Sequence, residues 1–184
     1  MTQQASIQKT GQKTGFDAAV IRGHFPILDQ QVNGKPLVYL DSAASAQKPQ
    51  MVLDTMSSAY SQTYANVHRG LHYLSEASTD AYEAVRGKVA QLIGASSEKE
   101  IVFTSGATMA LNLIGHCYGN INLGEGDEVL ISVADHHANI VPWHLLSGRV
   151  GSKTIAAPVD ADGSFNMEQF KAHITPRTKI ISVP

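Results

Sequence analysis

An apolar run of strand length, Glu128-Val129-Leu130-Ile131-Ser132, is followed after Val133 by the polar stretch Ala134-Asp135-His136-His137-Ala138-Asn139. The apolar run predicts a buried strand of a parallel sheet. Polar groups that leave water need a hydrogen bond or an ion in compensation. The polar stretch is therefore expected either to lie at the surface or to form a site.

Strands and helices alternate on both sides of this stretch. Apolar runs predict further strands at residues 101–104, 153–158 and 178–183, and helical spacing predicts helices at 109–118, 140–150 and 166–172. This alternation is typical of an α/β fold with a mostly parallel sheet and flanking helices. No helix follows the last strand to cover it, which favours a truncated chain or a piece of a larger protein.

The residues before 101 predict three helices and one hairpin. Helical spacing is seen at residues 16–23, at 49–66 and from Ser75 to Gly94, and Asn33-Gly34 is a turn signal between residues 31–32 and 37–40. The small residues of 41–46 either let a backbone approach a ligand or form a plain connection.

Composition predicts an ordinary globular protein of one domain. Of the 184 residues 43% are hydrophobic and 16% charged, and the formal net charge is -2, so no bias toward nucleic acid or anionic lipid is present. The single cysteine, Cys117, excludes an intrachain disulfide, and a cytoplasmic setting is the default. Residues 1–15 are expected to be a disordered tail and 16–184 the folded domain.

Two strand-to-helix loops carry candidate chemistry, and the topology predicts that both lie at the carboxyl edge of the sheet. The loop Thr104-Ser105-Gly106-Ala107-Thr108 offers backbone amides at a helix start, which suit a phosphate-sized anion. A plain helix cap is the commoner use of such residues. Because the Walker and Gly-x-Gly-x-x-Gly patterns are absent from the sequence, nucleotide triphosphates and dinucleotides are disfavoured as ligands.

The histidines admit several interpretations. His136 and His137 are adjacent, so only one ring is expected to face a common ligand. A metal site built from His68, His72, His136 and His144 is a minor alternative, and no metal is predicted. A hydrogen-bonded structural role is the default for any one of them.

Four stretches together resemble a known family. They are Phe25-Pro26-Ile27-Leu28, residues 38–49 from Val38-Tyr39-Leu40-Asp41 to Pro49, Val67-His68-Arg69-Gly70-Leu71-His72, and residues 135–143 from Asp135-His136-His137 to Trp143. In order and kind, these resemble the SufS/CsdA type of cysteine desulfurase, in the class V aminotransferases of fold-type I pyridoxal 5′-phosphate (PLP) enzymes. The resemblance spans about residues 16–184 and corresponds to the N-terminal part of a family member, an incomplete PLP-binding large domain.

The resemblance implies roles for particular residues. His136 would stack on the pyridine ring of PLP and transfer protons, while His137 and Asn139 would support its loop. Met109 departs from the acid that the family usually has there, which puts the hydrogen bonds of that helix start in question. The cofactor phosphate would be held by Gly106, Ala107 and Thr108, and the substrate would be bordered by Ala43, Ala44, His68 and Arg69.

The implied reaction converts L-cysteine into L-alanine and leaves a persulfide on the enzyme for iron-sulfur cluster assembly. A sulfur-acceptor protein and a homodimer are the implied partners, without nucleic acid or membrane. The family's cofactor-binding lysine, pyridine-binding aspartate and nucleophilic cysteine would lie beyond residue 184, so the isolated chain is expected to be inactive. Alternatives are a lyase acting on L-selenocysteine, another class V enzyme, or a non-enzymatic remnant that serves as an interaction module.

Overall fold

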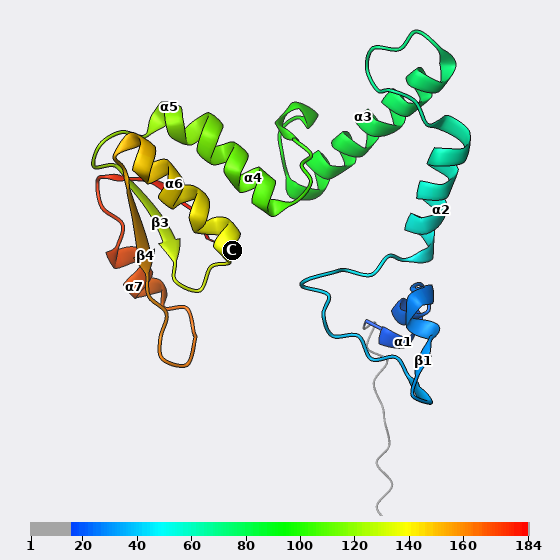
Figure 1. Cartoon of the computed structure of the whole chain (residues 1–184), viewed down its shortest axis with the longest axis horizontal. Coiled ribbons are helices and arrows are strands. Elements are labelled where there is room, and N and C mark those ends of the chain that lie inside the picture. The colour runs from blue at the N-terminus through cyan, green and yellow to red at the C-terminus, as the bar shows by residue number, and fades with distance from the viewer. Residues whose placement is uncertain (1–15, 184) are drawn as a thin grey trace, which may run out of the picture. The chain divides into compact units, whose positions relative to one another are not determined.

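The structure is a computed structural model that describes residues 16–183. The chain divides into two units, Met1–Ile101 and Val102–Pro184, and each is described by itself. Figure 1 labels the helices and strands of both. The disordered tail predicted for residues 1–15 lies outside the described residues.

The second unit contains a parallel sheet of three strands. Strand β3 (Glu128–Ser132) lies between β4 (Lys153–Ala157) and β5 (Thr178–Ile181), and both neighbours run parallel to it. The β3–β4 register is regular, whereas the β3–β5 register shifts after Glu128. The predicted α/β fold with a parallel sheet is confirmed.

One face of this sheet is covered by helix α6 (Val141–Val150). Val129 and Ile131 of β3 form a buried cluster with Trp143 and Leu146 of this helix. Alternate residues of a strand point to opposite faces, so Leu130 points the other way. Burial of Val129, Ile131, Trp143 and Leu146 removes their apolar surface from water and so stabilises this unit.

Helix α7 (Met167–Ala172) covers the opposite face. Its Phe170 packs with Leu130 of β3 and Ala157 of β4. The Asn166 side chain accepts hydrogen bonds from the amides of Glu168 and Gln169, which caps the helix start. The sheet therefore lies between two helical layers.

The prediction of a strand at residues 101–104 is wrong. This segment has no regular secondary structure and belongs to neither sheet of the described residues, and Val102 is 67% exposed. It is followed by α4 (Ala107–Ile114), a wide π-type turn at Gly115–Gly119 and α5 (Asn120–Asn122). A strand requires a neighbour to receive its hydrogen bonds, and an apolar run alone does not supply one.

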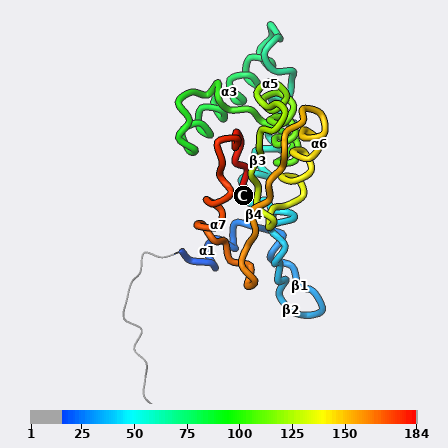
Figure 2. Tube along the Cα trace, turned by 90° about the vertical axis from the view of Figure 1, so that its left-hand side faces the viewer, coloured from blue at the N-terminus to red at the C-terminus, as the bar shows by residue number. Residues whose placement is uncertain are grey.

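The first unit begins with α1 (Ala18–Arg22) and the hairpin of β1 (Gln31–Val32) and β2 (Lys35–Pro36). Asn33 and Gly34 both have positive φ, 53° and 72°, as a tight two-residue hairpin turn requires. Figure 2 shows this turn. The second strand was predicted at residues 37–40 and instead starts directly after the turn.

Two helices complete the first unit. They are α2 (Gln50–Ser58), which continues as a π-type turn at Ala59–Thr63, and α3 (Tyr73–Ile93). Helix α3 begins two residues before the predicted Ser75, because the ring of His72 accepts a hydrogen bond from the Ser75 amide. It ends at Gly94 in the left-handed conformation, as predicted. No helix among residues 16–183 is long and apolar enough to cross a membrane.

Candidate functional site

A cavity of about 390 Å³ opens at the carboxyl ends of the strands in the second unit. Segments that follow β3 and β5 meet the first turn of α4 there, which is where α/β folds bind ligands. The structure thus brings the two candidate loops together. The cavity is lined by Ala107, Thr108, Leu111, Asp135, His136, Ala138, Asn139, Ser182 and Val183.

The turn before α4 depends on Gly106. Its φ of 155° and ψ of 175° belong to a region that only glycine occupies readily. A Cβ here would meet no atom within 4 Å, so the backbone, rather than crowding, requires the glycine. Within the described part of the chain, no side chain caps this helix, which leaves the first-turn amides available to an anion.

The departure at Met109 does not disturb this turn. The Ser105 hydroxyl donates to the sulfur of Met109 over 3.3 Å, and the Ala110 amide donates to the Gly106 carbonyl over 3.1 Å. The hydroxyl of Thr104 donates to the same carbonyl over 3.0 Å. The helix therefore starts regularly without an acidic residue at that position.

The ring of His136 is oriented by its own loop. Its Nδ1 accepts a hydrogen bond from the Ala138 amide over 3.0 Å. A backbone amide can only donate, so the proton of the neutral imidazole lies on Nε2. The His137 ring lies nearly perpendicular to that of His136, at 85°, and lines a neighbouring hollow of about 280 Å³. Of the two histidines, His136 alone lines the cavity at the carboxyl edge of the sheet.

Asp135 places a buried carboxylate in the cavity wall, a role that was not predicted from the sequence. The side chain is 8% exposed, and its Oδ2 accepts from the Ser132 amide over 2.9 Å. Its Oδ1 is buried without a hydrogen-bond partner among the described residues. A donor that enters the cavity would stabilise this oxygen. The sequence feature that could have indicated this role is an acidic residue shortly after a predicted strand and directly before His136.

Asn139 fixes the loop to two other elements. Its Nδ2 donates to the Ser182 carbonyl over 3.1 Å, and its Oδ1 accepts from the Ser182 hydroxyl and from the Trp143 indole over 2.5 and 3.0 Å. Asn139 is 8% exposed and Trp143 is 1% exposed. The loop is therefore held against α6 and the end of β5. Ser182 was missed because its partner is 43 residues away in the sequence.

These features fit a ligand that carries a phosphate and a flat ring. The free amides of α4 suit the phosphate, the imidazole of His136 offers a surface for stacking, and Asp135 offers an acceptor. No lysine is found among the cavity residues in the described part of the chain. No cluster of three or more metal-binding side chains was found there either.

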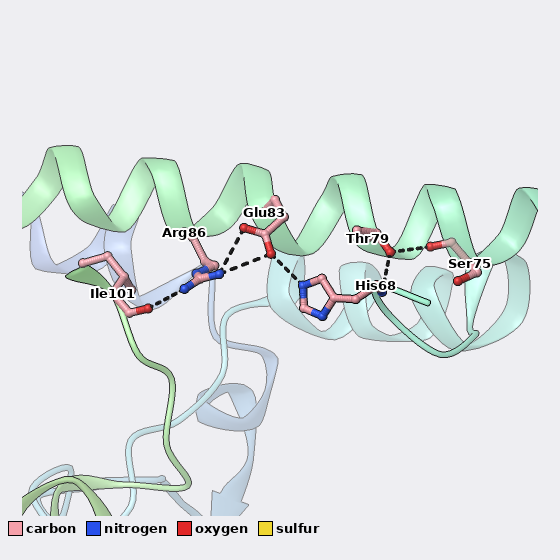
Figure 3. A network of polar contacts seen from close by, with 6 residues as sticks. All are labelled: His68, Ser75, Thr79, Glu83, Arg86 and Ile101. Atoms are coloured by element: carbon pink, nitrogen blue, oxygen red, sulfur yellow. Dashed lines mark hydrogen bonds and ion pairs between the residues drawn. The ribbon is translucent and has the colours of Figure 1, made fainter. Parts of the chain in front are cut away.

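The other predicted site residues lie in the first unit. Ala43 and Ala44 belong to a loop whose ends are drawn together by the Tyr39 hydroxyl, which donates to the carbonyls of Asp41 and Ser45. His68 has a positive φ of 75°, and its Nε2 lies 2.8 Å from a carboxylate oxygen of Glu83 (Figure 3). That Ala43, Ala44, His68 and Arg69 border a substrate stays a prediction.

Comparison with known proteins identifies the family. The sequence model of the family described as Aminotransferase class-V matches residues 38–184. A probable cysteine desulfurase of Vibrio cholerae is 50% identical over 163 residues, which are 89% of this chain and 40% of the relative. The cysteine desulfurase CsdA of Escherichia coli is 38% identical, with a TM-score of 0.73, over 91% of this chain and 41% of that chain.

A cysteine desulfurase of Thermococcus onnurineus gives a TM-score of 0.81 at 30% identity, over 92% of this chain and 40% of that one. The chain thus spans about 40% of the length of these three relatives. The predicted resemblance to cysteine desulfurases is confirmed by these matches, and the chain belongs to the aminotransferase class-V family.

Proposed function

We propose that this chain forms the phosphate-binding and ring-stacking part of a PLP-dependent cysteine desulfurase. The observation that carries the proposal is that the first residues of α4, Ala107 and Thr108, line one cavity with His136 at the carboxyl edge of the sheet. The proposed overall reaction is the conversion of L-cysteine to L-alanine with sulfur retained on the protein as a persulfide. Residues 16–184 would be the N-terminal part of the PLP-binding domain.

Three groups would hold the cofactor. The amides of Gly106, Ala107 and Thr108 would bind its phosphate, since they open α4 and carry no side-chain cap. The ring of His136 would stack on the pyridine ring, and Oδ1 of Asp135 would accept a hydrogen bond from the ligand. When bound, PLP supplies an electron sink for bonds to the α-carbon of an amino acid.

His136 would also handle a proton. The Ala138 amide fixes its Nδ1 as an acceptor, so Nε2 is the ring atom that can exchange a proton with the substrate. Asn139 keeps the loop in place through its bonds to Ser182 and Trp143. The imidazole would therefore meet the substrate in one defined orientation.

The remaining assignments are part of the same proposal. Ala43, Ala44, His68 and Arg69 would border the amino acid, and a homodimer and a sulfur-acceptor protein would be the partners in the cytoplasm. Because no lysine lines the cavity in residues 16–183, the isolated chain would bind the cofactor without a covalent bond and would release no alanine.

The test is a binding titration with pyridoxamine 5′-phosphate, which carries the ring and phosphate of PLP but cannot condense with surface lysines. Unphosphorylated pyridoxamine is the comparison ligand. We expect saturable binding of the phosphorylated compound only, and weaker binding in the variant His136→Ala. Equal affinity for both compounds would contradict the assignment of the phosphate site.

A second candidate is an interaction module, which the open edge of the sheet favours. Strand β5 pairs with β3 on one side and with no strand on its other side among the described residues. Such edges recruit other strands. Size-exclusion chromatography of the chain decides this alternative, because a monodisperse monomer would count against it.

A further inference from the structure

The two carboxylate oxygens of Asp135 differ in their surroundings. Asp135 is 8% exposed, and its Oδ2 accepts a hydrogen bond from the Ser132 amide over 2.9 Å. Its Oδ1 is buried and has no hydrogen-bond partner among the described residues. Burial of an acceptor without a donor costs free energy, and the cost is larger for a carboxylate than for a neutral group. A ligand that brings a donor to Oδ1 would therefore bind more tightly than one that does not.

The other side chains of the cavity do not supply this donor. Nδ2 of Asn139 donates to the Ser182 carbonyl, and the Ser182 hydroxyl donates to Oδ1 of Asn139. No lysine or arginine lines the cavity in the part of the chain that the structure describes. The donor for Asp135 is therefore expected to come from the ligand itself.

An organic cation suits this oxygen better than a metal ion. No group of three or more histidine, cysteine, aspartate or glutamate side chains that could hold a metal is found in residues 16–183. Hydrogen bonds between a carboxylate and a positively charged N–H group are about twice as strong as those between neutral groups. A primary ammonium is such a group, because it keeps its proton at neutral pH.

The same cavity also favours an anion at a second place. It is lined by Ala107 and Thr108, the first residues of α4, and no side chain caps this helix start within the described residues. The amides of a helix start attract an anion, whereas the carboxylate of Asp135 attracts a cation. The cavity thus suits a ligand that carries a phosphate and a protonated nitrogen together.

We propose that Asp135 is a specificity-determining residue that makes this cavity select the amine form of the phosphorylated pyridine compound over its alcohol form. The inference rests on the proposed function, in which the cavity holds the phosphate and the pyridine ring. Pyridoxamine 5′-phosphate carries a primary ammonium beside the ring, and pyridoxine 5′-phosphate carries a neutral hydroxyl at the same position. The ammonium donates to Oδ1 of Asp135 with the strength of a charged hydrogen bond, and the hydroxyl does not.

The test is a calorimetric titration of the chain with these two compounds. We expect the wild type to bind pyridoxamine 5′-phosphate about tenfold more tightly than pyridoxine 5′-phosphate. In Asp135→Asn the amide oxygen can still accept from the Ser132 amide, which places the NH₂ group where Oδ1 lies. A donor then replaces the acceptor, so this variant should lose about tenfold in affinity for the amine and keep its affinity for the alcohol.

Asp127→Asn is the matched control. Its Oδ2 accepts from the Gly124 amide over 2.9 Å, as that of Asp135 does from Ser132, but Asp127 does not line this cavity. The variant removes the same charge from the same unit and should bind both compounds like the wild type. An equal loss of affinity for the amine in Asp127→Asn would assign the preference to overall charge and overturn the inference.

The remaining outcomes separate this inference from the proposed function. Equal affinity of the wild type for the two compounds would overturn the inference and leave the phosphate site standing. A preference that Asp135→Asn does not change, or equal weakening of both compounds in that variant, would also overturn it, because Asp135 would then have no part in the choice or only a structural one. A wild-type chain that binds neither compound would overturn the proposed function, and with it this role of Asp135.

Discussion

The indole of Trp143 donates to Oδ1 of Asn139 over 3.0 Å, and the same oxygen accepts from the Ser182 hydroxyl. One amide thus joins the loop that carries His136 to the buried core. Asn139→Ala would leave the Trp143 donor buried and unpaired, so we expect a loss of about 1–3 kcal/mol in the free energy of unfolding. Urea denaturation of the chain measures it.

Ser182→Ala is the matched control for this bond. It removes one donor and leaves Asn139 with the indole and its own bond to the Ser182 carbonyl, so its loss should be smaller. An Asn139→Ala variant as stable as the wild type would show that the three bonds do not hold the loop.

Gly106→Ala tests the turn at the proposed phosphate site. The backbone angles of Gly106 exclude a side chain, so we expect destabilisation of about 1–3 kcal/mol and loss of affinity for pyridoxamine 5′-phosphate. Gly148, an open position within α6, is the control. There alanine should stabilise the helix by about 0.5–1 kcal/mol. If alanine stabilised the chain at Gly106 as well as at Gly148, the claim that the turn requires a glycine at position 106 would be refuted.

Gly70→Ala tests how closely the loop of residues 64–72 lies on α3. A Cβ at Gly70 would lie 2.1 Å from Oγ and 2.3 Å from Cβ of Ser75, which is 1% exposed. We expect the loop to be displaced at a cost of about 1–3 kcal/mol in unfolding free energy. Gly87→Ala, in an open position of α3, should instead be stabilising. Amide exchange in residues 64–72 that Gly70→Ala leaves unchanged would contradict the close contact.

The attachment of His68 to Glu83 is expected to weaken in acid. The pKa of Glu83 is lowered in the folded chain, chiefly by the hydrogen bond from His68, so its stabilising contribution is complete above the ordinary glutamate pKa. It is lost as the pH falls through the lowered value. The ¹³C carboxyl signal of Glu83 and the amide signals of residues 64–72 should therefore change together. Glu83→Gln should abolish this transition, and Asp80→Asn, at an exposed acid one turn away on α3, should keep it.

The sequence predicted the strands β3, β4 and β5 because each is an apolar run between turn signals. It also placed the loops of Gly106 and His136 at one edge of the sheet, although the strand of residues 101–104, on which the placement of the Gly106 loop rested, does not form. It failed at residues 101–104, where the apolar run gives no information about a neighbouring strand.

Contacts between residues that are far apart in the sequence were harder to predict. His68 and Glu83 are 15 positions apart, and Asn139 and Ser182 are 43 apart. On α3 a Glu followed three residues later by an Arg has the pattern of an ordinary surface pair. Only the path of the loop shows that this pair also meets a histidine.

The most direct test of the central claim is an amide ¹H–¹⁵N titration of the chain with pyridoxamine 5′-phosphate. We expect saturable shifts of the Gly106, Ala107 and Thr108 amides, together with the ring signals of His136, and no such shifts with unphosphorylated pyridoxamine. Binding without a response at Gly106, Ala107 and Thr108, or no binding at all, would contradict the claim that this turn and His136 form the cofactor site.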